Sequence, residues 1–393
     1  MTRKEDQNGC VYFQLEREKQ HAMISLKYLV FLLIKCVLSK QIYPEYVKNY
    51  FQLISTIDQP LSLRKYYRMQ QSAIDFYNGT MNLILSVPHD GDLSSNLPKR
   101  PRTACRKITS SSKKCYYQNP CLSSQYKLDR KVCPISHGRD LNTRLLALAV
   151  RYELNEFFQL KPYVIINRLE RSKVDMNRFI DEGTFNVRES MHAWMRYHFY
   201  LKHARELIVR NPWNIDGKGL LFDLHSQQHQ QNWIELGYLI SSRQLARDKY
   251  YLNTSSLSSY LARLFSPKEI IIGEKSLGYF LTKYQYLATP SPNFPSPPEQ
   301  SYYEWGYTIE EHGRTGNFSA IMIESPAKEL HNLTKLYFYA KALASAIREY
   351  IIEIELFEAL IPPVDIQEKQ RCNSSRQLHI QISIFLLLFF SII

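Results

Sequence analysis

Four side chains that can take part in metal or acid–base chemistry follow or end short apolar runs of the sequence: His89, Asp92, His225 and Glu324. In an open α/β sheet, functional side chains gather just beyond the carboxyl ends of the strands, so residues in these places are expected to meet in one site. A catalytic zinc ion takes three protein ligands and keeps its fourth position for water. Two imidazoles and a carboxylate meet this need, and we predict a zinc site formed by His89, Asp92 and His225.

The predicted zinc site has a candidate base and a candidate orienting group beside it. The spacing His-x-x-Asp lets His89 and Asp92 turn towards one ion where the strand ends, and Asp223 or a neighbouring carbonyl could orient the ring of His225. Zinc lowers the pKa of its water and polarises a carbonyl, and Glu324 would move the proton from that water to the leaving nitrogen. The alternatives are structural: a hydrogen-bonded strand-end histidine at 89, a turn former at 92 and a surface carboxylate at 324.

Apolar, β-branched runs alternate with helical stretches along the chain. Near-continuous apolar character indicates strands buried on both faces, and we expect strands at 81–87, 163–166, 220–224, 236–240, 269–272 and 320–323. Apolar residues with a helical period predict long helices at 141–158, 188–210 and 330–357. Strands that alternate with helices are typical of an α/β fold with a parallel or mixed central sheet.

The composition is that of a globular protein with a basic excess. Hydrophobic residues make up 45% and charged residues 22% of the 393 residues, which excludes global disorder. The net charge is +13. Because the basic residues are scattered and no nucleic-acid-binding motif accompanies them, we expect no nucleic-acid partner.

Both ends of the chain carry features of export and lipid attachment. We interpret residues 1–22 as an extension upstream of the true start, and residues 23–39 as a signal peptide whose apolar run is too short to span a bilayer. Small residues, a short spacer and an apolar tail predict a glycosylphosphatidylinositol-anchor signal at 373–393. An uncleaved anchor helix is the alternative at either end. Between them we expect a single domain, residues 40–370, in the secretory pathway and then outside the cell or attached to its surface.

A cysteine-bearing insertion, residues 93–139, follows directly after the first metal motif. It holds four of the seven cysteines: Cys105, Cys115, Cys121 and Cys133. In an exported chain, four close cysteines indicate two disulfides, for which three pairings exist. A zinc knuckle would need Cys-x-x-Cys pairs, which the sequence lacks. Asn-x-Ser/Thr triplets, at Asn78 among other places, are compatible with an exported glycoprotein.

Four segments resemble, in their order along the chain, those of a known hydrolase family: SVPHDGDL, VIINRLERSKVDMNR, LLFDLHSQ and IELGYLIS. From about residue 81 to residue 324 the chain resembles the N-formylglutamate amidohydrolases, and NRLERSKVDMNR is the most specific element. That family is similar to zinc carboxypeptidases and aspartoacylases. The resemblance implies a three-layer αβα domain around a mixed sheet, with His89, Asp92 and His225 as zinc ligands and Glu324 as the general base.

The resemblance also implies roles for the second of these segments. Asn177 and Arg178 would bind the substrate carboxylate, and Arg171 would stabilise the developing oxyanion. Arg168 is the alternative to Arg171 and a further candidate for substrate binding. One residue departs from the pattern, since Asp92 stands where such sites usually carry Glu, and the ion would have to lie closer to the backbone.

The predicted function is that of a zinc-dependent hydrolase that cleaves the amide bond of an N-formyl or N-acyl amino acid, with this small molecule as its partner. One alternative is a cell-surface binding protein that kept the fold and lost turnover. Another is a carboxypeptidase-like exopeptidase. A binding module has no need of a base, so the presence of Glu324 together with the ligand residues favours an enzyme. An exported enzyme would not meet the intracellular intermediate that names the family, so the sequence predicts the reaction class rather than the substrate.

Overall fold

The structure is a computed structural model that describes residues 44–61, 73–107, 115–116, 128–212, 214–298, 302–314 and 316–356. The chain divides into two units, residues 1–56 and 57–393, and residues 44–56 of the first unit form a helix. The predicted extension, signal peptide and anchor signal lie outside the described residues. Within the described ranges, every helix is too short or too polar to cross a membrane.

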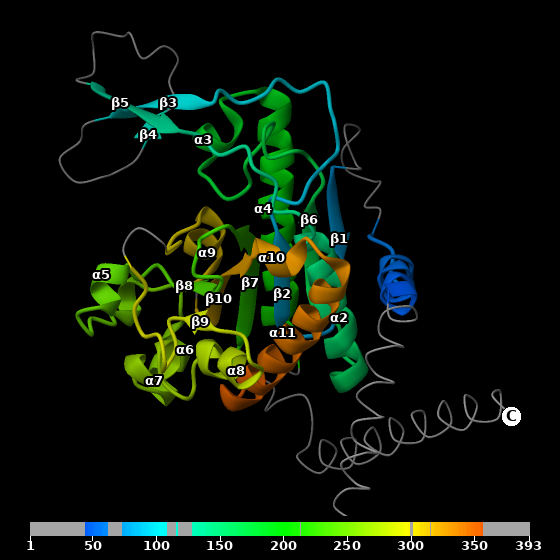
Figure 1. Cartoon of the computed structure of the whole chain (residues 1–393), viewed down its shortest axis with the longest axis vertical. Coiled ribbons are helices and arrows are strands. Elements are labelled where there is room, and N and C mark those ends of the chain that lie inside the picture. Colours follow the sequence, from blue (N-terminus) through cyan, green and yellow to red (C-terminus); the bar gives the residue numbers. More distant parts are fainter. Residues whose placement is uncertain are drawn as a thin grey trace, which may run out of the picture. The chain divides into compact units, whose positions relative to one another are not determined.

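A mixed seven-stranded sheet forms the centre of the second unit (Figure 1). In spatial order its strands are β1 (Ile74–Tyr77), β6 (Tyr163–Asn167), β2 (Leu83–Val87), β7 (Gly219–Gln227), β10 (Phe318–Pro326), β8 (Ile234–Gly237) and β9 (Ala288–Thr289). The four central strands β6, β2, β7 and β10 run parallel to one another. On the two sides of this group, β1 pairs with β6 and β8 pairs with β10, both in antiparallel fashion. The carboxyl ends of the four parallel strands therefore meet at one edge of the sheet.

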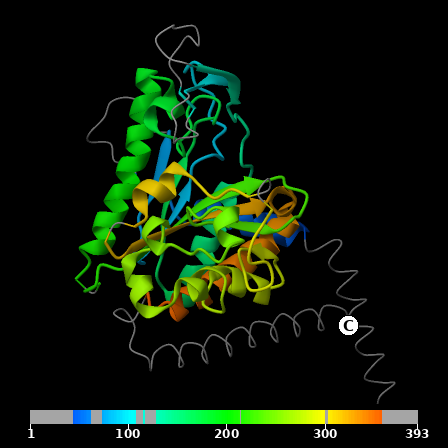
Figure 2. The ribbon, with the colours of Figure 1, turned by 90° about the vertical axis from the view of Figure 1, so that its left-hand side faces the viewer.

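Helix α4 (Arg188–Val209) covers one face of this sheet and is the long green helix at the left of Figure 2. Its buried residues recur with a helical period: Ala193, Tyr197, Leu201, Ala204 and Ile208. They pack with Ile84, Ile165 and Leu221, one residue from each of three neighbouring strands. Because side chains alternate along a strand, Asp223 and His225 of β7 lie on the same face as Leu221. Helices α3 (Ile180–Thr184) and α9 (Tyr307–His312) contact α4.

The remaining helices complete the second unit. Helices α2 (Thr143–Phe158) and α11 (Leu333–Glu353) pack against each other, and α2 contacts β2, β6 and β7. Helix α8 (Leu277–Lys283) contacts α11 and β9, and α10 (Ala327–Leu330) connects β10 to α11. Four short helices lie between β8 and α8 in the chain: α5 (Ser242–Leu245), η1 (Leu252–Thr254), α6 (Ser259–Leu264) and α7 (Pro267–Ile271).

The insertion at 93–139 contains a second sheet. Strands β4 (Cys115–Tyr116), β3 (Thr103–Lys107) and β5 (Leu128–Pro134) pair antiparallel in that order. This small sheet is separate from the seven-stranded sheet and is drawn at the top of Figure 1. Cys121 and the side chains of the other three cysteines lie outside the described part of the chain. The two disulfides therefore stay a prediction.

The strand predicted at 269–272 is wrong, because this segment belongs to helix α7. Ser266 caps that helix: its hydroxyl accepts a hydrogen bond from the amide of Glu269, and the Glu269 carboxylate accepts one from the amide of Ser266. Pro267 at the first helical position also favours a helix start. A short apolar run alone does not distinguish a strand from a buried helix, and here the capping residues decide. The other predicted strands and the three long helices are confirmed, with ends that differ by a few residues.

Candidate metal centre

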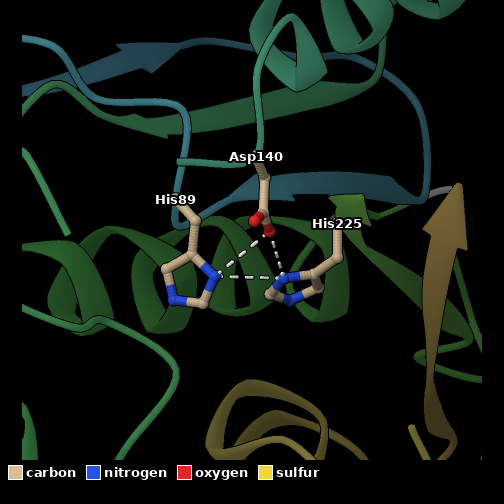
Figure 3. Close-up of side chains that lie close together, drawn as sticks. All are labelled: His89, Asp140 and His225. Carbon is tan, nitrogen blue, oxygen red and sulfur yellow. Dashed lines mark hydrogen bonds and ion pairs between the residues drawn. The ribbon is translucent and has the colours of Figure 1, made fainter. Parts of the chain in front are cut away.

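Two histidines and an aspartate bring three metal-ligand atoms together (Figure 3). Nδ1 of His89 lies 3.1 Å from Nδ1 of His225, and Oδ2 of Asp140 lies 3.3 Å from the first and 3.0 Å from the second. The side chains of His89, His225 and Asp140 are 1%, 3% and 8% exposed. A tetrahedral zinc ion with these ligand types holds its ligand atoms about 3.3 Å apart. The spacing of the three atoms therefore fits such an ion.

The outer nitrogen of each histidine is held by a second carboxylate. Nε2 of His89 lies 2.6 Å from Oδ1 of Asp175, and Nε2 of His225 lies 2.9 Å from Oδ2 of Asp223. An ionised carboxylate only accepts hydrogen bonds, so each Nε2 carries the proton and each Nδ1 presents a lone pair. Two lone pairs and the Asp140 oxygen then face one another. This arrangement requires a positive charge between them, either a proton or a metal ion, and carboxylate-held imidazoles are the usual ligands of bound metals.

The loop after β2 explains how Asp140 reaches His89 although 51 residues separate them. Asp90 is buried and accepts hydrogen bonds from the amides of Asn142, at 3.2 Å, and Arg144, at 2.8 Å, where α2 begins. The amide of Asp140 donates to the carbonyl of His89 at 3.1 Å. These hydrogen bonds hold the start of α2 against the loop that contains His89 and Asp90. The same contact places the carboxylate of Asp140 at the centre.

The predicted ligand Asp92 is not brought to the two histidines. Its side chain is 56% exposed and pairs with Arg139 at 3.2 Å. The preceding Gly91 lies directly against the backbone of Leu169, so closely that a Cβ atom there would come within 2.0 Å of its carbonyl oxygen. Because of this close approach, the chain after Gly91 runs alongside the segment that follows β6, where the amide of Leu93 donates to the carbonyl of Arg168 at 2.7 Å. The side chain of Asp92 then points outward. The structure therefore replaces Asp92 by Asp140 among the side chains that surround the candidate centre.

Glu324 lies beside the candidate centre and is nearly buried. It stands opposite His225 in the pairing of β10 with β7, and opposite Glu235 in the pairing of β10 with β8. Side chains directly opposite each other on neighbouring strands are within contact distance. Burial raises the pKa of Glu324 to about 8, helped by the negative charges of Asp140 and Glu235 and opposed by His225 and Arg171. Such a carboxyl group can exchange a proton near neutral pH.

Two arginines hold the outer carboxylate Asp175. Nε of Arg171 lies 3.0 Å from Oδ2 of Asp175, and Nη2 of Arg100, which comes from the insertion, lies 3.3 Å from the same oxygen. Nη1 of Arg171 also lies 3.8 Å from Oδ1 of Asp140. Sequence reasoning placed Arg171 in the site but missed the contacts of Asp175 and Arg100. The spacing Arg-x-x-x-Asp from 171 to 175 was a readable signal for this ion pair, whereas nothing in the sequence pointed to Arg100.

The three other predicted substrate-binding residues lie in three different surroundings. Nδ2 of Asn177 lies 3.0 Å from Nε2 of His225, and its Oδ1 accepts a hydrogen bond from the amide of Thr308 at 2.9 Å. Arg178 pairs with Glu182 at 3.2 Å, and its guanidinium stacks over Trp305. Arg168 pairs with Asp75 of β1 at 3.3 Å. Of the three, the structure brings Asn177 to the centre.

The charges of the centre shift the pKa values of its members in opposite directions. Burial alone would lower the pKa of His225, but the carboxylates of Asp223, Glu324 and Asp140 raise it well above its ordinary value. Burial alone would raise the pKa of Asp140, but the neighbouring His225, His89 and Arg171 side chains hold it below the ordinary value. Burial likewise opposes ionisation of Asp175, whose pKa Arg171 and His89 hold well below normal. Without a metal, His225 is therefore the group that carries the positive charge.

Comparisons with known proteins give likenesses of fold at low sequence identity. No protein-family model matches the chain, and no curated protein matches it. Similar solved structures include an N-formylglutamate amidohydrolase from Ralstonia eutropha (TM-score 0.41, 13% identity, 72% of this chain and 98% of that one). A gene product of Agrobacterium tumefaciens has a TM-score of 0.39 and 14% identity, over 74% of this chain and 99% of that one. A proposed metallopeptidase from Shewanella denitrificans has a TM-score of 0.32 and 11% identity, over 80% and 90%.

Proposed function

We propose that the protein is a zinc-dependent amidohydrolase that cleaves the amide bond of an N-formyl or N-acyl amino acid. The observation that carries the proposal is the convergence of two carboxylate-held imidazoles and Asp140 on one point, with a nearly buried Glu324 beside them. A structural histidine pair would not need both Nδ1 lone pairs to face a carboxylate oxygen. The donor set of two nitrogens and one oxygen is that of hydrolytic zinc sites.

Each residue of the centre has a role in this reaction. His89, Asp140 and His225 would hold the ion, which supplies the Lewis acidity that activates water and polarises the amide carbonyl. Glu324, which stands opposite His225 in the pairing of β10 with β7, takes a proton from the water and delivers it to the leaving nitrogen. Arg171 stabilises negative charge on the former carbonyl oxygen. Asn177 and Arg178 orient the substrate, and a guanidinium is suited to a carboxylate of the substrate.

One further feature supports the assignment to this class of hydrolase. The segments that resemble N-formylglutamate amidohydrolases contribute His89, Arg171, Asp175, Asn177 and His225, and these residues surround the centre. We also propose the three-layer αβα arrangement that the resemblance implies. Helix α4 packs on the face of Ile84 and Leu221, and α2 with α11 would cover the opposite face, to which the alternate side chains point.

The first test is the metal content of the purified full-length chain, measured by elemental mass spectrometry. We expect a single zinc ion per chain in the natural sequence and none in the His89→Ala/His225→Ala double variant, with Asp92→Ala as the control that keeps the ion. The zinc-loaded protein is then assayed for amine release from a series of N-formyl and N-acyl amino acids. A folded protein without metal would overturn the proposal and favour the binding-protein alternative. Release of C-terminal residues from peptides, without hydrolysis of N-acyl amino acids, would favour an exopeptidase.

Export and surface attachment belong to the proposal as well. The segments on which they depend, 23–39 and 373–393, lie outside the described residues. Treatment of intact cells with a phosphatidylinositol-specific phospholipase should release the protein if a lipid anchor holds it. Retention on cells after this treatment, with a control anchored protein released, would contradict the anchor.

A further inference from the structure

A second pair of histidines lies buried between α4 and α9, outside the candidate metal centre. Nδ1 of His198 lies 3.0 Å from Nε2 of His312. The centroids of the two rings are 5.3 Å apart, and the ring planes are nearly parallel, with an angle of 8° between them. Nε2 of His198 lies 2.8 Å from the carbonyl oxygen of Met176. On the far side, Nη1 of Arg205 lies 3.4 Å from Nδ1 of His312. The contacts form one chain, from Arg205 through the two imidazoles to a backbone carbonyl.

The direction of these hydrogen bonds follows from what each group can do. The Met176 carbonyl only accepts, so Nε2 of His198 donates to it and Nδ1 of His198 accepts from Nε2 of His312. Nδ1 of His312 is then left to accept from Arg205. Both imidazoles are neutral in this arrangement. Burial favours the neutral form, since it lowers the pKa of His198 to about 4 and that of His312 well below its ordinary value.

The carbonyl that His198 holds belongs to the segment that supports the metal centre. Met176 lies between Asp175, which holds His89, and Asn177, which contacts His225. The two side chains leave the backbone on either side of Met176. A shift of the Met176 carbonyl would therefore move both contacts to the centre together.

Helices α4 and α9 both form hydrogen bonds with residues 176–178. From α4, Nε1 of Trp194 donates to the carbonyl of Arg178 at 3.0 Å, in addition to the His198 contact. From α9, the amide of Thr308 donates to Oδ1 of Asn177 at 2.9 Å, and the amide of Tyr307 to its carbonyl at 3.4 Å. The hydrogen bond between His198 and His312 connects α4 to α9 next to the Met176 carbonyl.

We propose that His198 is a positioning residue for the metal centre. Fixed by His312, it holds the Met176 carbonyl and so sets the approach of Asp175 and Asn177 to the two ligand histidines. The inference rests on the proposed function in that it takes the His89–Asp140–His225 cluster as the metal centre. It adds a support that acts through the backbone and that none of the sequence motifs indicated.

The test compares two substitutions of His198 in the full-length chain. In His198→Gln the amide nitrogen reaches the place of Nε2 and still donates to the Met176 carbonyl. In His198→Asn the amide reaches only the place of Nδ1, and this donor is lost. His192→Asn makes the same change on the exposed side of α4 and serves as the control. The probe is Co²⁺, whose visible absorption reports the geometry of its ligands and whose affinity is measured by titration.

We expect His198→Asn to weaken Co²⁺ binding by roughly 10–100-fold, as the loss of an outer partner does, and to change the cobalt spectrum. We expect His198→Gln and His192→Asn to bind Co²⁺ as the natural sequence does. Equal affinity and an unchanged spectrum in His198→Asn would overturn the inference, and so would equal losses in the Gln and Asn variants. If His198→Asn does not fold, His198→Met, which likewise lacks the donor to the Met176 carbonyl, takes its place with the same expected direction.

A second measurement separates this inference from the proposed function. Amide hydrogen exchange of residues 175–178 is followed in the metal-free protein. We expect faster exchange there in His198→Asn and unchanged exchange in His198→Gln. If the natural sequence bound no cobalt, the proposed function would fail, and amide hydrogen exchange of residues 175–178 would be the remaining test of the inference. Faster exchange in His198→Asn would support the inference, and unchanged exchange would overturn it.

Discussion

Replacing Asp140 by alanine should abolish tight metal binding, whereas Asp92→Ala should leave it intact. The Asp140 carboxylate lies 3.0 Å and 3.3 Å from the two Nδ1 atoms and is 8% exposed. Loss of an outer partner alone costs 10–100-fold in metal affinity, so loss of a ligand is expected to cost at least about 100-fold. This corresponds to about 2.8 kcal/mol of binding free energy.

The same two variants should also differ in stability without metal. Asp140 faces His225 and Arg171 in a buried centre, and removal of one member of a buried ion pair typically costs about 3–5 kcal/mol of unfolding free energy. Asp92 forms an exposed pair with Arg139, and such pairs contribute about 1 kcal/mol or less. A near-neutral effect of Asp92→Ala is therefore expected.

Both quantities are measured on matched samples. Zinc affinity is obtained by competition with a chromophoric chelator, and the unfolding free energy by urea denaturation in the presence of a strong chelator. A chain in which Asp92→Ala loses zinc while Asp140→Ala keeps it would refute the reasoning. That result would restore the ligand set predicted from the sequence and would mean that the contact between Asp90 and the start of α2 does not fix the position of Asp140.

Three further predictions follow from the charges of the centre. Asp223→Asn keeps an acceptor for His225 Nε2 but removes the negative charge, and should weaken zinc binding by roughly 10–100-fold. Ser86→Ala, which removes only the hydroxyl that donates to Asp223, is the milder comparison. A zinc affinity of Asp223→Asn equal to that of the natural sequence would contradict this prediction. Zinc binding at pH 7 should release at least one proton, because the raised pKa of His225 keeps it charged until the ion displaces the proton; calorimetry in buffers of different ionisation enthalpy measures this, and no buffer dependence would speak against it. The metal-free protein should lose stability as the pH rises from about 4.5 through about 8, because the folded chain retains a proton on Glu324 that the unfolded chain releases. Glu324→Gln should flatten this slope in urea denaturation, and an unchanged slope would be evidence against the raised pKa.

The parts of the site that could be predicted from the sequence are those set by strand ends. His89, His225 and Glu324 each lie at or just past the carboxyl end of a central parallel strand, and the apolar runs that marked those strands were long enough to read. The orienting role of Asp223 followed from its place two residues before His225, on the same face of β7. Strands β1 and β9, of 4 and 2 residues, were too short to carry a readable alternation.

Asp140 could not be predicted in the same way because its position depends on a contact distant in sequence. It follows the insertion, and it is drawn to His89 only when Asp90 accepts hydrogen bonds from the first amides of α2. The spacing His-x-x-Asp pointed to the nearer carboxylate instead.

The balance of charge connects the metal to the base. Three buried carboxylates, those of Asp140, Asp175 and Asp223, lie around the centre together with two guanidinium groups, those of Arg100 and Arg171. One positive charge is missing, and in the metal-free protein the proton on His225 supplies it.

A divalent ion that displaces this proton brings two positive charges in exchange for one, which leaves a single positive charge in excess. The ionised form of Glu324, which stands opposite His225, neutralises that excess. Binding of the ion should therefore lower the pKa of Glu324 from about 8 and turn a neutral acid into the base that the proposed hydrolysis needs. On this argument the raised pKa of the metal-free protein does not conflict with catalysis. The surplus of carboxylates that raises the pKa of Glu324 without an ion is what makes the site ready to accept one.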